Sequence, residues 1–179
     1  NGRDLPRWTA GSHINVVFGE TGISRQYSRC GDPDDARAFE IAVLRETQSR
    51  GGSAWVHENE NVKPGAHWRI RGPRNHFRLD ETAKKLVLIA GGIGITPIYC
   101  MIRRLAALGR PWELYYSTRS RRDAAFLAEL GKFPNAHFHF DDEEGGKFLQ
   151  VAGSVVGWPE GRTHARADAA SASRAAPTR

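Results

Sequence analysis

A short glycine-rich turn constrains the fold of this chain more than any other feature of its sequence. The turn at residues 91–97 follows an apolar run, residues 86–90, that has the length of a buried strand. After it, residues 95–108 place their apolar side chains on one face at helical spacing. A strand, a glycine turn and a helix in this order are the context in which a dinucleotide pyrophosphate binds at a helix N-terminus.

The turn departs from the usual dinucleotide fingerprint at two points. Pro97 stands where the third spaced glycine is expected after Gly92 and Gly94. The acid expected about twenty residues further on is misplaced, because Glu113 begins the next strand instead of ending it. The residues at the end of that strand are Ser117, Thr118 and Arg119. The pattern alone therefore leaves two interpretations open, a dinucleotide site and a plain tight turn.

Strand and helix patterns continue to alternate after the turn. Residues 112–117 and 136–140 have the composition of strands, and residues 123–130 that of a helix with Asp123 as its N-cap. Alternation of this kind predicts a parallel sheet with right-handed helical crossovers over residues 81–150.

Residues 1–80 have a different texture, with short strands separated by Gly and Pro. We expect strands at residues 13–18, 39–44 and 68–71 and a short helix at residues 53–58. Gly72 and Pro73 are expected to end the third strand. The pattern favours a small antiparallel barrel or sandwich.

Two segments of this first region have the residue types of an anion site. Arg25 and Tyr27 share one face of a strand, where a guanidinium suits a phosphate and a phenol ring can stack on a heterocycle. Residues 51–53 offer glycine and a hydroxyl before a helix. Each segment has a plainer interpretation, an exposed strand edge for the first and a loop with Ser53 as N-cap for the second.

Composition excludes several classes of function. The formal charge is +6, but the basic residues are scattered, so we expect no nucleic-acid partner. No apolar run approaches the length of a membrane span, so we expect no membrane partner. Cys30 and Cys100 suit a reducing cytoplasm and cannot supply a plant-type iron–sulfur cluster. His137 and His139 share a strand face, which we interpret as structural, so no metal is assigned.

Taken together and in order, several motifs resemble one known family. The strand motif at residues 25–28, the segment 42–45, the loop 51–53 and the turn 91–97 resemble the ferredoxin–NADP reductase superfamily. The likeness is to its phthalate dioxygenase reductase branch, which includes vanillate demethylase reductases, and covers roughly residues 5–150. It implies an antiparallel β-barrel flavin domain followed by an α/β Rossmann-like parallel-sheet NAD-binding domain, each incomplete in this chain.

The resemblance also implies roles for particular residues. Arg25 would hold the phosphate of FMN, Tyr27 would pack against the isoalloxazine, and Ser28 would lie near its reactive nitrogen. The implied cofactor-binding positions are Arg25, Gln26, Tyr27, Ser28, Ala42, Val43, Gly51, Gly52, Ser53, Gly91, Gly92, Gly94, Thr96, Pro97, Ser117, Thr118 and Arg119. No catalytic acid or base is implied, because the cofactors carry the chemistry of this family.

The implied activity is hydride transfer from NADH to a bound flavin, FMN in this branch, with electrons passed on to an oxygenase component. The open alternatives are FAD, NADPH, a free flavin or ferric reductase, and a non-catalytic remnant. The departures from the family are an early strand missing before Leu5, Arg29 in place of an apolar residue, and the absence of the Cys-Gly-Pro turn and of the 2Fe-2S domain. Residues 151–179 are expected to be disordered or to come from a shifted frame or truncated gene.

Overall fold

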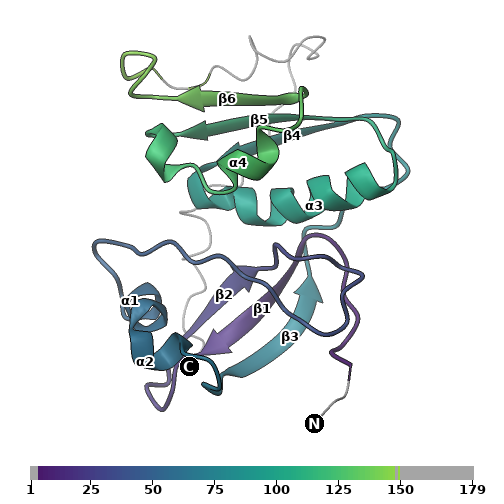
Figure 1. Cartoon of the computed structure of the whole chain (residues 1–179). Helices are drawn as coiled ribbons and strands as arrows, with labels where there is room; N and C mark the ends of the chain where they lie inside the picture. The colour runs from purple at the N-terminus through teal and green to yellow at the C-terminus, as the bar shows by residue number, and fades with distance from the viewer. Residues whose placement is uncertain (1–3, 148, 150–179) are drawn as a thin grey trace. The chain divides into compact units, whose positions relative to one another are not determined.

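The computed structural model describes residues 4–147 and 149 in two compact units, which meet in the sequence at Asp80 and Glu81 (Figure 1). The prediction of a disordered or frameshifted tail, residues 151–179, lies outside the described residues. Within the described residues, no helix has the length and apolar character needed to cross a membrane.

The first unit is built on a three-stranded antiparallel sheet in the order β2-β1-β3. Its strands are β1 (Ser12–Val17), β2 (Ser24–Ser28) and β3 (Arg69–Asn75) (Figure 1). Alternate residues of β1 are buried, as the two-residue period of a strand requires. The antiparallel class is confirmed, but the described residues form an open sheet and not a closed barrel.

Two short helices, α1 (Gly52–His57) and α2 (Asn59–Val62), accompany this sheet. Val56 of α1 packs into the core with Ile14, Val16 and Phe18. The Phe18 ring lies 5.1 Å from the ring of Trp55. Aromatic and aliphatic burial of this kind stabilises the contact between helix and sheet.

Two strand predictions in this unit were wrong in detail. Residues 39–44 form no strand, and Ile41 makes a single bridge to Arg29, so the sheet gains no further strand there. β3 does not end at Gly72 and Pro73 but continues through them. The register shifts opposite these residues, and such an irregularity accommodates a proline that has no N–H to donate.

The second unit has a three-stranded parallel sheet in the order β4-β5-β6, which confirms the predicted α/β class. Its strands are β4 (Leu86–Gly91), β5 (Trp112–Thr118) and β6 (Ala136–Phe140). The long helix α3 (Ile95–Ala107) lies along the sheet (Figure 1). The predicted core residues Ile98, Met101, Ile102 and Leu105 are at most 2% exposed, whereas Leu108, beyond the helix end, is 41% exposed.

The second predicted helix of this unit is shorter than its sequence pattern suggested. A 3₁₀ turn occupies Arg121–Asp123, and α4 spans only Leu127–Leu130. Asp123 is not the N-cap of α4, because that helix begins at Leu127 with Phe126 as its N-cap, and the Asp123 carboxylate accepts from the Ser120 hydroxyl instead. Phe126 takes a left-handed conformation, with φ 59°, and stacks on the Tyr99 ring at 4.2 Å. This ring contact stabilises a break that local propensity did not indicate.

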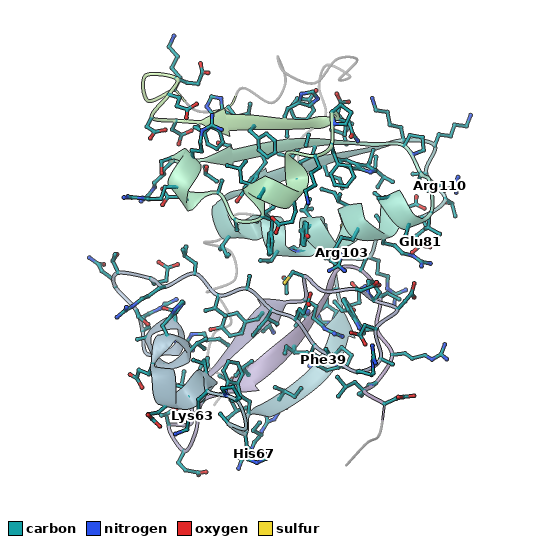
Figure 2. All side chains as sticks on the ribbon, in the orientation of Figure 1. Phe39, Lys63, His67, Glu81, Arg103 and Arg110 are labelled. Atoms are coloured by element: carbon teal, nitrogen blue, oxygen red, sulfur yellow. The ribbon has the colours of Figure 1, made fainter. Side chains whose placement is uncertain are left out.

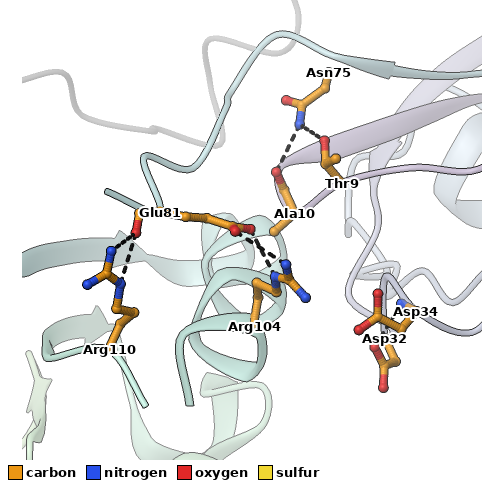
Figure 3. Close-up of polar contacts among 8 residues, drawn as sticks. All are labelled: Thr9, Ala10, Asp32, Asp34, Asn75, Glu81, Arg104 and Arg110. Carbon is orange, nitrogen blue, oxygen red and sulfur yellow. Dashed lines mark hydrogen bonds and ion pairs between the residues drawn. The ribbon is translucent and has the colours of Figure 1, made fainter. Parts of the chain in front are cut away.

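Polar contacts tie down the segments on either side of the unit boundary (Figure 3). In the first unit, the Asn75 amide donates to the Thr9 hydroxyl at 2.7 Å and to the Ala10 carbonyl at 2.9 Å. In the second, Glu81 pairs with Arg104 of α3 at 2.9 Å, and its carbonyl accepts from Arg110. The segment next to the boundary is therefore held by side-chain contacts within its own unit.

Candidate functional site

Arg25 and the glycine loop, which the sequence predicted as separate anion-binding segments, lie together in the structure. The Arg25 guanidinium donates to the carbonyls of Arg50 and Ser24 at 3.1 and 2.9 Å. A Cβ atom added to Gly52 would lie 2.9 Å from Arg25 Cγ and 3.0 Å from Phe18 Cε2. Glycine is therefore required there for the start of α1 to approach β2 this closely.

The hydroxyl groups of this loop have different partners from those expected. Ser53 does not cap α1, since its hydroxyl donates to Ser49 Oγ at 3.0 Å and accepts from the Glu46 amide at 3.2 Å. Ser49 instead accepts from the Ala54 amide, inside the first turn of α1. Gly51 precedes the helix with φ 90°, a left-handed conformation that suits glycine. The sequence did not single out Ser49, because it lies before the glycine pair.

The strand motif presents its side chains as alternation predicts. Arg25 and Tyr27 pair with Val16 and Ile14 of β1 and share their face, while Gln26 and Ser28 alternate with them along β2. Tyr27 stands edge-on to Phe18, with ring centroids 6.4 Å apart. Burial raises the pKa of the Tyr27 phenol, and the nearby Arg25 charge opposes that rise.

Ala42 and Val43 lie half-buried in a segment fixed by a side chain of α1. The Val43 carbonyl accepts a hydrogen bond from Nε2 of His57 at 2.9 Å. His57 was missed by sequence reasoning, since nothing in its local pattern indicates a partner fourteen residues earlier in the chain.

The glycine turn of the second unit is open. Gly91 ends β4 in an extended conformation, and Gly92 turns the chain with φ 49°, where a side chain would be strained. A Cβ atom at either glycine would meet no other atom within 4 Å in the described part of the chain. Gly94 then leads directly into α3. There is accordingly room for a ligand to approach this backbone closely.

Thr96 and Pro97 occupy the first turn of α3, which continues directly from the 3₁₀ turn Gly92–Gly94, so that the Ile95 amide donates to the Gly92 carbonyl. The Thr96 hydroxyl donates to the Ile93 carbonyl at 3.1 Å, which stabilises the turn. Pro97 lacks an N–H and suits this position.

Tyr116 holds the turn in place and was not singled out by the sequence. Its side chain is buried, its hydroxyl donates to the Gly92 carbonyl at 3.1 Å, and it accepts from the Ala125 amide at 3.1 Å. The hydroxyl thereby links the glycine turn to the segment between β5 and α4. Burial is the main cause that raises the pKa of Tyr116 to about 12.

We expect Tyr116→Phe to loosen the glycine turn. The substitution removes both hydrogen bonds while leaving the ring, so roughly 1 to 2 kcal/mol of unfolding free energy should be lost. Urea unfolding monitored by circular dichroism measures this loss. Tyr115→Phe is the matched control, because it removes from the same strand a hydroxyl that donates to the Glu113 carboxylate and not to the glycine turn, so that a smaller loss is expected. An unfolding free energy equal to that of wild type would contradict the assigned role.

The raised pKa of Tyr116 also predicts a dependence of stability on pH. The folded state keeps this proton after the unfolded chain, with its ordinary pKa of 10.0, has lost it. The stabilisation is therefore complete below pH 10 and is lost as the pH rises through about 12. Its size is on the order of 2 to 3 kcal/mol. The unfolding free energy of wild type should fall relative to that of Tyr116→Phe by roughly 2 kcal/mol between pH 9.5 and 11.5, enough to cancel or reverse the difference between them. A constant difference would count against the assigned role.

The residues at the end of β5 lie beside the glycine turn, as the predicted parallel sheet requires. Ser117 pairs with Gly91 in the register, and its hydroxyl lies 3.5 Å from the carboxylate of Asp141. Thr118 is buried and donates to the Ser120 carbonyl. Arg119 is exposed and has no side-chain ion pair or hydrogen bond within the described residues. Asp141 was missed because it follows β6, a strand later than the acid that the fingerprint expects.

The acidic residue that the sequence placed at the wrong end of β5 has a structural role. Glu113 pairs with Lys85 at 2.8 Å and with His137 at 3.1 Å. The Lys85 ammonium is the main cause that lowers the pKa of the Glu113 carboxyl. His139 likewise contacts Asp141, so neither histidine is part of a three-ligand metal cluster within the described residues.

Comparison with known proteins identifies relatives along most of the chain, although no family model matches it. It is 48% identical over 158 residues to phenoxybenzoate dioxygenase subunit beta of Ectopseudomonas oleovorans, covering 88% of this chain and 48% of that protein. It is 41% identical to vanillate O-demethylase oxidoreductase of Pseudomonas putida, covering 89% of this chain and 50% of that protein. The chain spans about half the length of the curated relatives that it matches.

Solved structures agree with these relatives. The match to phthalate dioxygenase reductase is 36% identical with a TM-score of 0.76, and it covers 85% of this chain and 48% of that protein. The match to an intact type IV self-sufficient cytochrome P450 monooxygenase is 44% identical with a TM-score of 0.78, and it covers 89% of this chain and 20% of that protein.

The two units therefore have the folds of the flavin-binding and NAD-binding domains of ferredoxin–NADP reductase-type proteins. Within that superfamily, the relatives of this chain are phthalate- and vanillate-type oxygenase reductase components. The resemblance noted in the sequence is confirmed.

Proposed function

We propose that this chain binds FMN and NADH and passes a hydride from the nicotinamide to the flavin, as the electron-input part of an oxygenase or demethylase system. The observation that carries the proposal is the open turn at Gly91 and Gly92, on a chain 48% identical to an oxygenase subunit of this branch. FMN when bound would accept the electron pair and release electrons singly.

The flavin side of the proposal rests on the first unit. Arg25 and the loop residues Gly51, Gly52 and Ser53 would hold the phosphate of FMN. The fit is supported by the close approach of Gly52 to Arg25, which places a guanidinium beside the backbone that starts α1. The ring would be held by the strand motif and by the segment that His57 fixes, namely Gln26, Tyr27, Ser28, Ala42 and Val43.

The nucleotide side rests on the second unit. The pyrophosphate would lie against the glycine turn at the start of α3, formed by Gly91, Gly92, Gly94, Thr96 and Pro97. The adenosine ribose would lie beside Ser117, Thr118 and Arg119, at the carboxyl end of β5. We propose NADH as the nucleotide and a separate oxygenase component as the electron acceptor. The names of the relatives support this partner.

We further propose that the protein works in the cytoplasm, where NADH is available. Both cysteines, Cys30 and Cys100, are buried thiols that suit a reducing compartment.

Reduction of ferricyanide by NADH tests this function directly. Purified protein is loaded with FMN or FAD, unbound flavin is removed, and the bound flavin is identified by its mass. We expect FMN to be retained and NADH to be oxidised at a rate proportional to the bound FMN. Turnover with FAD alone would indicate a free flavin or ferric reductase. Absence of turnover with both flavins would indicate a non-catalytic remnant and overturn the proposal.

A further inference from the structure

Arg29 is a completely buried cation immediately after β2. Its guanidinium carbon lies 3.4 Å from the ring centroid of Trp8 and 3.5 Å from that of Phe39, so the group is stacked between two aromatic rings. Its Nη2 donates to the Ala38 carbonyl at 3.0 Å. Phe39 is labelled in Figure 2. A cation stacked on two ring faces and donating to a carbonyl is held in one geometry.

The contacts of Arg29 join the end of β2 to a segment that begins nine residues later in the chain. Its side chain holds Ala38 and Phe39, and its backbone bridges to Ile41. The amide of the next residue, Cys30, donates to the Glu40 carbonyl at 3.1 Å. Residues 38–41 are thus attached to the end of β2 although they form no strand.

The attached segment leads directly to Ala42 and Val43. The Val43 carbonyl is fixed from the other side by His57. Arg29 also directly follows Tyr27 and Ser28, the last residues of the β2 motif, in the chain. Arg29 therefore connects both groups of residues that are proposed to hold the flavin ring.

We propose that Arg29 is a positioning residue of the flavin site, which sets residues 38–43 against the end of β2 so that the wall of the ring site is formed before FMN binds. This inference rests on the proposed function. A role as simple core filler is less favourable, because burying a guanidinium costs solvation free energy that an apolar side chain of similar size does not lose. The planar guanidinium instead fixes the orientation of the groups around it, because it stacks on the Trp8 ring and donates to the Ala38 carbonyl.

Arg29→Leu tests the inference, with Arg37→Leu as the matched control. Arg37 lies nearby in the chain with its side chain 90% exposed, so the same replacement there should change nothing. We expect Arg29→Leu to keep a melting temperature equal to or above that of wild type and to bind FMN about tenfold more weakly. The visible circular dichroism of bound FMN should change, and the Cys30 amide should exchange its hydrogen faster. A role confined to stability would move neither the dichroism nor the affinity.

Two further variants keep the test decisive. Phe39→Leu leaves the cation in place and removes one face of the stack, so it should give the same changes to a smaller degree even if Arg29→Leu does not fold. Arg29→Lys keeps the charge without the planar fork, so it should bind FMN as weakly as Arg29→Leu. If both Arg29→Leu and Phe39→Leu bound FMN with wild-type affinity and dichroism, the role of Arg29 would be overturned and the proposed function would stand. Failure of wild type to bind FMN or FAD would overturn the proposed function and this inference with it.

Discussion

Replacing Gly52 with valine is expected to weaken FMN binding strongly. The first added atom would already lie 2.9 Å from Arg25 Cγ and 3.0 Å from Phe18 Cε2, and the branches of valine would crowd both further. Arg25 would be displaced from its place beside the Arg50 carbonyl, and the phosphate would lose its charge-assisted partner. We expect FMN affinity to fall by about 100-fold or more. Overpacking should also lower the unfolding free energy by about 1 to 3 kcal/mol.

The comparison that isolates this effect is Ala54→Val, which adds a similar side chain to the same helix two positions later. FMN titration of flavin-free protein by fluorescence quenching gives the affinities, and urea unfolding gives the stabilities. Gly52→Ala should fall between wild type and Gly52→Val, because its single Cβ requires a smaller shift. Equal FMN affinity in Gly52→Val and Ala54→Val would show that the phosphate binds elsewhere.

The sequence predicted those elements whose side chains repeat with a clear period. α3 has its apolar residues at helical spacing, and Ile102 and Leu105 are fully buried as that spacing requires. The parallel sheet followed from strand and helix alternation, which left few other topologies. Gly91 and Ser117 meet across the sheet because parallel strands bring their carboxyl ends together.

The wrong predictions fall where one tertiary contact outweighs local preference. Residues 39–44 alternate like a strand, but the Ala38 carbonyl takes its hydrogen bond from the Arg29 side chain, and only Ile41 bridges to Arg29. Phe126 breaks the expected helix because its ring stacks on Tyr99, a partner that no local window contains.

Two of the site residues that the sequence missed each have a partner far away in the sequence. The Tyr116 hydroxyl meets the Gly92 carbonyl across the sheet, and His57 meets Val43 across a loop. Tyrosine and histidine at these positions have the local pattern of an ordinary strand and an ordinary helix end. The motifs therefore predicted the groups that are proposed to contact the cofactors. The groups that hold those motifs in place could be identified only from the folded structure.

Replacing Gly91 with valine is expected to weaken nucleotide binding strongly while leaving the fold intact. Gly91 has an extended backbone, with φ −123° and ψ 130°, which valine adopts readily in a strand. Its Cβ would meet no atom of the described residues within 4 Å, so the folded state should lose less than about 0.5 kcal/mol. The same space is where the pyrophosphate is proposed to approach the turn, and a valine there would keep it from the backbone of residues 91–94.

Unchanged stability together with weaker nucleotide binding would separate ligand binding from folding, which few glycine substitutions allow. Loss of two hydrogen bonds to a charged phosphate corresponds to an affinity about 100-fold weaker for NADH, measured by its fluorescence on binding. Val87→Ile is the control, because residues 87 and 91 share one face of β4 and the added methyl lies at the far end of the strand. If Gly91→Val bound NADH like Val87→Ile at equal stability, the open turn would be a structural feature alone. Weaker binding without loss of stability would support a ligand that needs the room a glycine leaves, and it would locate the nucleotide at the end of β4.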